Sequence, residues 1–224
     1  MDLEPCIVPQ GLLYDVDGSV WVRLVDESAV VGVTHPFLCL VGNPLKIDFR
    51  QVRYVREGGY LAVIQTKKFY GPVFSPVSGE VVEFNKSLTE MPYLLSEDPY
   101  QAGWLAKIII QNHQPKLVDA ETIKSIVSKK MKEQGLECFK HIPDYTVSGI
   151  GGDCPETLAK LGELLKNIDD REKVHLVTDN PKADTDVPSW TKAHNYKILE
   201  KQIQGSIKHF IIGKQRDGFA AGGI

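Results

Sequence analysis

The chain has 224 residues, enough for two small domains that each bury a core of their own. Its hydrophobic content of 42% and charged content of 25% are typical of a globular protein and exclude a disordered or fibrous chain. The net charge of -3 argues against a nucleic-acid partner, because nucleic-acid binding depends on clustered lysines and arginines.

Short β-branched and aromatic runs fill the chain from Gly11 to Ile110. They lie at residues 21–25, 30–33, 37–41, 61–64, 73–74 and 81–84. Turn residues such as Gly58-Gly59 and Gly71-Pro72 separate several of these runs. The pattern predicts an all-β module, with each run as a strand.

The apolar spacing changes to a helical period between Asp119 and Gln134. Apolar side chains fall on one face there, lysines fall elsewhere, and Gly135 is a suitable stop. The sequence therefore predicts one helix that closes the first domain.

The rest of the chain alternates between strand and helix patterns. The expected elements are a strand at 145–148, a helix at 155–168, a strand at 174–178, a helix at 186–194 closed by Asn195, and strands at 197–203 and 208–212. This order, βαβαββ, predicts an α/β two-layer domain in which the helices cover one face of a sheet. Residues 216–224 have little to bury, so we expect a flexible tail.

No segment predicts secretion or a membrane span. The first residues, Met1-Asp2-Leu3-Glu4-Pro5, lack the basic start and apolar run of a signal peptide. No later apolar run approaches the length that a bilayer requires. We therefore expect a cytoplasmic protein.

The cysteines show no metal-binding or disulfide pattern. Cys6, Cys39, Cys138 and Cys154 include no CxxC pair, which argues against both a zinc site and a disulfide framework. Cys6 is expected at the surface, Cys39 in a strand, and Cys138 in a structural or incidental position. Histidines 35, 113, 175, 194 and 209 form no recognisable group and are expected at the surface. Any reactive cysteine is then a reduced thiol.

Two lysines, Lys67 and Lys68, lie between strand-like runs and therefore at a predicted hairpin turn. The surrounding sequence resembles the glycine-cleavage H protein and, more broadly, lipoyl domains. The matching stretches are Val31-Gly-Val-Thr34, Phe74-Ser-Pro-Val-Ser-Gly-Glu-Val-Val-Glu-Phe-Asn85, Met91-Pro92, Asp98-Pro-Tyr100 and Gly103-Trp-Leu105. The resemblance implies a lipoyl/biotinyl-type barrel-sandwich hybrid that carries lipoate on Lys68, with Lys67 as the alternative. Such an arm lets one dithiol visit several active sites.

Two positions depart from that family. Gln65 stands where the family has Glu before the lysine, which favours a dedicated lipoate ligase. Ser19-Val20-Trp21 stands where the family has His-Glu-Trp, which argues against a role in glycine cleavage. A glycine-cleavage H protein that carries an aminomethyl group remains the alternative function.

Cys154 lies between a predicted strand and a predicted helix, and Pro155 suits the first turn of that helix. At a helix start the macrodipole favours a thiolate, so we expect a lowered pKa for this cysteine. The segment Gly151-Gly-Asp-Cys-Pro-Glu-Thr157 resembles the Gly-x-x-Cys-Pro-x-Pro loop of the TusA family of sulfur carriers, with Thr157 in place of the second proline. The resemblance implies that Cys154 accepts sulfur as a persulfide.

Together these features predict a carrier protein with sulfurtransferase-like character and no metal. We expect an H protein-like lipoyl domain at residues 1–136 and a TusA-like domain at 137–215. The resemblances imply a role in sulfur oxidation or trafficking of the heterodisulfide-reductase-like kind. The implied partners are a lipoate ligase, heterodisulfide-reductase-like enzymes and a sulfur donor such as a rhodanese-type protein.

Overall fold

The computed structural model describes residues 6–111 and 115–215. The chain divides into two compact units, Met1–Ile142 (unit 1) and Pro143–Ile224 (unit 2). The tail expected at 216–224 and His113 lie outside the described residues. Among the described residues, no helix combines the length and the apolar character needed to cross a bilayer.

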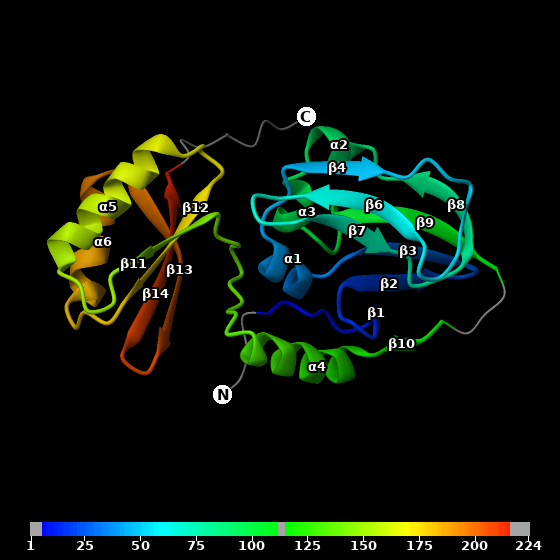
Figure 1. Ribbon diagram of the computed structural model, residues 1–224, viewed down its shortest axis with the longest axis horizontal. Helices are drawn as coiled ribbons and strands as arrows, with labels where there is room; N and C mark the ends of the chain where they lie inside the picture. The colour runs from blue at the N-terminus through cyan, green and yellow to red at the C-terminus, as the bar shows by residue number, and fades with distance from the viewer. Residues whose placement is uncertain (1–5, 112–114, 216–224) are drawn as a thin grey trace, which may run out of the picture. The chain divides into compact units, whose positions relative to one another are not determined.

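Unit 1 is built mainly from antiparallel strands (Figure 1). Its strands are β1 (Leu13–Asp15), β2 (Val20–Val25), β3 (Ser28–Val33), β4 (Lys46–Phe49), β5 (Tyr54–Val55), β6 (Tyr60–Gln65), β7 (Tyr70–Phe74), β8 (Gly79–Phe84), β9 (Trp104–Ile110) and β10 (Leu117–Val118). Its helices are α1 (His35–Val41), α2 (Ser87–Glu90), α3 (Leu94–Glu97) and α4 (Ala120–Glu133). Strands form most of the elements up to residue 110, as the sequence predicts.

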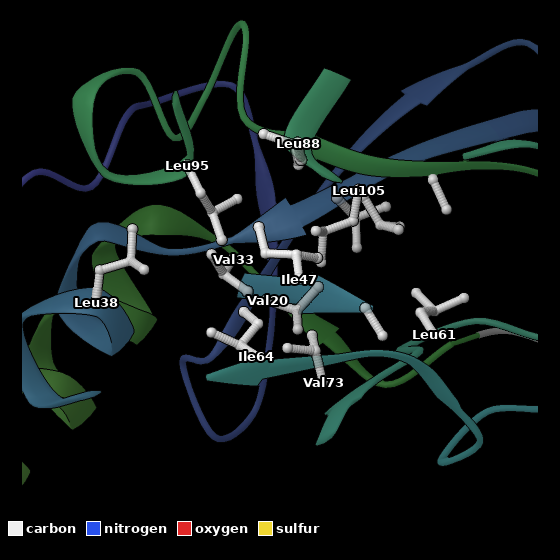
Figure 2. Packing of buried hydrophobic residues seen from close by; sticks show 14 of the residues in the cluster. Val20, Val33, Leu38, Ile47, Leu61, Ile64, Val73, Leu88, Leu95 and Leu105 are labelled. Atoms are coloured by element: carbon white, nitrogen blue, oxygen red, sulfur yellow. The ribbon is translucent and has the colours of Figure 1, made fainter. Parts of the chain in front are cut away.

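The strands form two sheets that share one core. A seven-stranded sheet has the order β10-β1-β2-β3-β9-β8-β5, and a three-stranded sheet has the order β4-β6-β7. Val33 of the first sheet, Ile64 of the second and Leu38 of α1 belong to one buried cluster (Figure 2). Burial of these apolar side chains from both sheets stabilises the two-layer arrangement.

The large sheet also packs on α4 through its other face. Successive strand side chains point to opposite faces, so Val20 and Val22 enter the core between the sheets while Trp21 enters a second cluster with Ile123 of α4. Helix α4 begins where expected, because the Asp119 carboxylate accepts a hydrogen bond of 2.8 Å from the Thr122 amide. The closing helix predicted from the lysine-rich segment is therefore confirmed.

The run at residues 37–41 is a helix and not the predicted strand. Helix α1 begins after Thr34, whose Oγ1 accepts a hydrogen bond of 3.2 Å from the Phe37 amide, and Pro36 occupies its first turn. Leu38 and Val41, three residues apart, are buried on one helical face. A five-residue apolar run shows no period that separates a strand from a buried helix, and the capping residue decides between them.

Unit 2 has the predicted order. It contains β11 (Tyr145–Ser148), α5 (Cys154–Asn167), β12 (Lys173–Thr178), α6 (Ala183–Ala193), β13 (Tyr196–Gln204) and β14 (Ile207–Lys214). The sheet order is β11-β12-β14-β13, in which β11 and β12 are parallel and the other pairs are antiparallel. Both helices lie on the same side of this sheet (Figure 1). Helix α6 begins three residues before the expected Asp186, and its N-cap, Lys182, makes no side-chain capping bond that the sequence could have signalled.

The cysteines contradict the expectation of no disulfide. Cys6 and Cys138 form a disulfide across 132 residues of sequence, with their Cα atoms 5.2 Å apart. Cys39 lies on α1 and not in a strand. Three of the histidines expected at the surface, His35, His175 and His209, are buried. Spacing rules find only pairs that are close in sequence, whereas the sheets bring these distant residues together.

Candidate functional site

The first candidate site is the hairpin between β6 and β7, where Lys68 is exposed. The side chain of Thr66 holds the turn together by hydrogen bonds. Its Oγ1 accepts hydrogen bonds from the Lys68 amide (3.1 Å) and the Phe69 amide (3.0 Å), and it donates one of 2.6 Å to the Val41 carbonyl. The turn is therefore fixed to the end of α1 while the amine of Lys68 is presented outside the core.

Helix α1 supports the lysine side chain as well. A Cβ atom at Gly42, the residue that ends α1, would lie 3.1 Å from Cε of Lys68. Gly42 also has φ +89°, a conformation that other residues rarely adopt. The ring of Phe69 packs edge-on against Phe37 of α1, with centroids 5.9 Å apart. The lysine thus lies beside α1, the helix that the sequence pattern missed.

The second candidate site is the loop between β11 and α5, where Cys154 is the first residue of the helix. The amide of Gly151 donates a hydrogen bond of 3.0 Å to the Asp179 carboxylate. Gly151 has φ +64°, which lets the loop turn sharply into α5. Cys154 is half-buried, so its sulfur lies at the domain surface and not deep in the apolar core.

Thr157 tightens this loop in place of the second motif proline. Its Oγ1 donates a hydrogen bond of 2.9 Å to the Asp153 carbonyl. A Cβ atom at Gly149 would lie 2.7 Å from the methyl group of Thr157, so only glycine fits there. The proline of the related motif has no hydroxyl and cannot make this bond.

The surroundings of Cys154 raise its pKa, which corrects the expected lowering. Burial raises the pKa of the thiol most, and the hydrogen bond and negative charge of Asp186 raise it further. The thiol donates to Asp186 Oδ2 at 3.5 Å. Asp186 lies in the first turn of α6, 32 residues away, so its carboxylate opposes a thiolate at the start of α5.

Lys208 of β14 positions the segment that carries Asp186. Its Nζ donates hydrogen bonds of 2.9 Å to the carbonyls of Asn180 and Pro181. It also pairs with Asp184 at 3.0 Å. These contacts hold the start of α6 against the sheet and so fix the carboxylate that faces Cys154.

Two candidate residues thus stand on two different folds. Lys68 lies on a hairpin of a two-sheet domain in unit 1, and Cys154 lies at a helix start of a two-layer domain in unit 2. Either group can hold a cargo covalently, the amine as an amide and the sulfur as a persulfide. Two covalent attachment points of this kind are what a carrier protein requires.

Comparison with known proteins identifies both parts. The family model for the glycine cleavage H-protein matches residues 12–131, more than half of the chain, so the chain belongs to this family. A second model, sulfurtransferase TusA, matches residues 150–214. The chain is therefore a fusion of an H protein-like lipoyl carrier domain with a TusA-like sulfur carrier domain. The predicted fold classes, a β-rich domain and an α/β domain, are confirmed.

Individual relatives match the first part. Glycine cleavage system H protein 2 of Aquifex aeolicus is 36% identical over 130 residues, which cover 57% of this chain and 80% of the relative. A probable glycine cleavage system H protein 2 of Sulfolobus acidocaldarius is 39% identical over 113 residues, covering 49% and 76%. A crystal structure of an H protein from Mycobacterium marinum shares 24% identity and a TM-score of 0.48, covering 58% of this chain and 100% of that one. Family members carry lipoate on a lysine.

Proposed function

We propose that this protein is a sulfur carrier with two handles, a lipoyl group on Lys68 and a persulfide on Cys154. In this proposal residues 1–136 are the lipoyl carrier domain and residues 137–215 the sulfur carrier domain. The pairing of an H protein-like domain with a TusA-like domain in one chain supports a shared sulfur cargo. Linking the two carriers raises the effective concentration of one at the other.

The observation that carries the proposal is the presentation of Lys68. Lys68 is exposed in a hairpin turn whose amides at residues 68 and 69 are hydrogen-bonded to Thr66 Oγ1. A ligase that attaches lipoate must reach the amine while reading a defined turn. The neighbouring Lys67 shares the hairpin, yet the motif that precedes Ser75-Pro76 aligns Lys68 with the modified lysine.

The chemistry of Cys154 is sulfur transfer by substitution. The thiolate attacks the outer sulfur of a donor persulfide, the donor thiolate leaves, and the sulfane sulfur remains on Cys154 as a persulfide. An acceptor thiolate then attacks that outer sulfur and restores the Cys154 thiolate. Asp186 keeps the resting sulfur protonated and hydrogen-bonded between transfers.

The partners follow from this chemistry. A lipoate ligase that accepts Gln65 in the recognition turn loads Lys68, and a donor such as a rhodanese-type protein loads Cys154. Heterodisulfide-reductase-like enzymes of sulfur oxidation or trafficking receive or supply the cargo. We place the carrier in the cytoplasm, where thiol reductants keep a sulfur such as Cys154 available.

Intact-mass analysis of protein from its native host tests the proposal. We expect one lipoyl increment that Lys68→Arg removes and Lys67→Arg leaves, together with a sulfur increment that Cys154→Ser removes and Cys39→Ser leaves. A lipoyl increment that disappears with Lys67→Arg would show that lipoate is attached to Lys67 and not to Lys68. If neither increment occurs in any growth condition, the chain is not a sulfur carrier.

A second function is favoured by the names of the relatives, which are glycine cleavage system H proteins. In that case lipoate on Lys68 would carry an aminomethyl group, and the TusA-like domain would be an accessory. An assay of the lipoylated protein with a glycine decarboxylase distinguishes the two functions. Loading with an aminomethyl group by a glycine decarboxylase supports the second function, whereas our proposal expects no loading.

A further inference from the structure

Four potential metal ligands meet in unit 1, and neither Lys68 nor Cys154 is among them. Cys6, His35, Cys39 and Cys138 form this cysteine–histidine cluster, in which three sulfurs and one imidazole come from three separate parts of the chain. His35 and Cys138 are each only 1% exposed, and Cys6 and Cys39 are half-buried. Neither the H protein-like nor the TusA-like carrier chemistry uses these residues.

The fold brings the four side chains together in a defined way. His35 and Cys39 lie four residues apart on α1 and therefore on one helical face. Cys138 follows α4, and its neighbour Phe139 accepts a weak hydrogen bond of 3.8 Å from the Cys39 thiol. The disulfide joins Cys6, ahead of β1, to Cys138. The cluster therefore ties the start of the described chain, α1 and the segment after α4 to one another.

The distance between the Cys39 sulfur and the His35 ring is close to that of a tetrahedral zinc site. With Zn–S near 2.3 Å and Zn–N near 2.0–2.1 Å, a tetrahedral site separates sulfur from nitrogen by about 3.6 Å and two sulfurs by about 3.8 Å. Cys39 Sγ lies 3.7 Å from His35 Nδ1. The ligand atoms of His35, Cys39 and Cys138 all lie within 4.8 Å of one another. Cys6 Sγ is bonded to Cys138 Sγ, so a reduced chain would have a fourth donor next to the other three.

We propose that the cluster is a redox-controlled zinc site, a Cys₃His centre in the reduced protein that the Cys6–Cys138 disulfide replaces on oxidation. In the oxidising step the two thiolates of Cys6 and Cys138 lose two electrons and form the S–S bond. A small disulfide accepts these electrons and becomes two thiolates. The zinc dissociates as Zn²⁺, and the Cys39 thiolate takes up a proton from solvent. Reduction by a dithiol reverses each of these changes.

The hydrogen bond between the Ile7 amide and His35 links the disulfide form to the zinc-binding form. In the disulfide form, His35 Nδ1 accepts a hydrogen bond of 3.2 Å from the Ile7 amide, and this bond occupies the lone pair that zinc would need. Ile7 follows Cys6 directly, so the movement that separates Cys6 from Cys138 withdraws the amide and releases the nitrogen. Tyr100 holds the backbone of His35 in place, because its hydroxyl accepts a hydrogen bond of 3.0 Å from the His35 amide.

Zinc titration of the full-length chain tests the site. The protein is reduced anaerobically, freed of reductant and titrated with Zn²⁺ against a chromophoric chelator, and a disulfide-oxidised sample is treated in parallel. We expect one equivalent of zinc in the reduced chain and binding weaker by roughly a hundredfold or more after oxidation, because two thiolate ligands are lost. Co²⁺ in place of zinc should give thiolate-to-metal charge transfer and tetrahedral visible bands.

Variants and a footprint identify the ligands. Cys6→Ser and Cys39→Ser should each weaken zinc binding by roughly tenfold or more, whereas Cys154→Ser, in the other unit, should leave it unchanged. In the unaltered reduced chain, zinc should protect Cys6, Cys39 and Cys138 from alkylation, as read by peptide mass, and leave Cys154 reactive. The footprint needs no variant to fold. A reduced chain that binds no zinc, or one in which zinc protects Cys154 alone, would overturn the proposal.

Discussion

At the residue scale, the chemistry of Cys154 depends on two opposing local charges. The start of α5 offers the positive end of a helix dipole, while Asp186 places a carboxylate 3.5 Å from the sulfur. Burial and the carboxylate raise the pKa of the thiol, so the thiol form is favoured near neutral pH. A carrier benefits, because its resting sulfur is less prone to side reactions than a thiolate.

Removal of the negative charge of Asp186 should show how strongly it raises the pKa of Cys154. Asp186→Asn should lower the pKa of Cys154 and raise its alkylation rate near neutral pH by roughly threefold or more, because the thiolate is the nucleophile. The pH at which alkylation is half-maximal should fall, and the rates of the two proteins should converge at high pH, where both thiols are ionised. Iodoacetamide kinetics followed by mass spectrometry measure this. Asp170→Asn, the same charge change beyond the far end of α5, serves as control, and an equal effect there would refute the role of Asp186.

At the element scale, α1 organises much of unit 1. Its end receives the hydrogen bond from Thr66, and its face carries His35 and Cys39. The hairpin that presents Lys68 therefore depends on a helix of seven residues. Such a short helix is not stable alone, and it persists because its apolar side chains are buried between the hairpin and the large sheet.

Thr66 offers a test of that dependence. Thr66→Val keeps the shape but removes the acceptor of the Lys68 and Phe69 amides and the donor to Val41, so unfolding free energy should fall by about 1–3 kcal/mol. Lipoylation of Lys68 by a ligase should slow as well. Urea denaturation and intact mass after timed ligation measure the two effects. Thr66→Ser keeps the hydroxyl, and if it behaves like the valine variant the hydrogen bonds are not what orders the turn.

At the scale of the whole molecule, the two units have separate cores. The clusters of unit 1 contain β-strand residues such as Leu105, whereas the third cluster contains only residues of unit 2, such as Leu161. No described residue belongs both to a unit 1 cluster and to the unit 2 cluster. Each carrier can therefore keep its fold when the other is perturbed.

Matched core variants should show this independence. Leu161→Ala should destabilise unit 2 by about 2–5 kcal/mol, and Leu105→Ala should do the same to unit 1, since both side chains are 0% exposed. Differential scanning calorimetry should show two transitions, with only one moving in each variant. Lipoylation of the Leu161 variant should remain unchanged. A single transition that moves in both variants would show that the units unfold together.

The two fold classes and the two candidate residues could be predicted from contiguous stretches of the sequence. The strand runs and the helical period between Asp119 and Gln134 are local patterns, and local patterns determine local structure. The family-like stretches around Lys68 and Cys154 are also contiguous, so they can be recognised in the sequence without the fold. The run at residues 37–41 is too short to show a period, so the sequence could not predict that it belongs to helix α1.

The contacts between residues that are distant in sequence could be learned only from the folded structure. The Cys6–Cys138 disulfide spans 132 residues, and the carboxylate that raises the pKa of Cys154 is 32 residues away. His35 and Cys39 share a helical face only because α1 is a helix, so the cysteine–histidine cluster could not be found before α1 was known. The pKa of a side chain and the set of ligands around a metal both depend on distances through space. The packing of sheets and helices sets those distances. The spacing of residues along the chain does not.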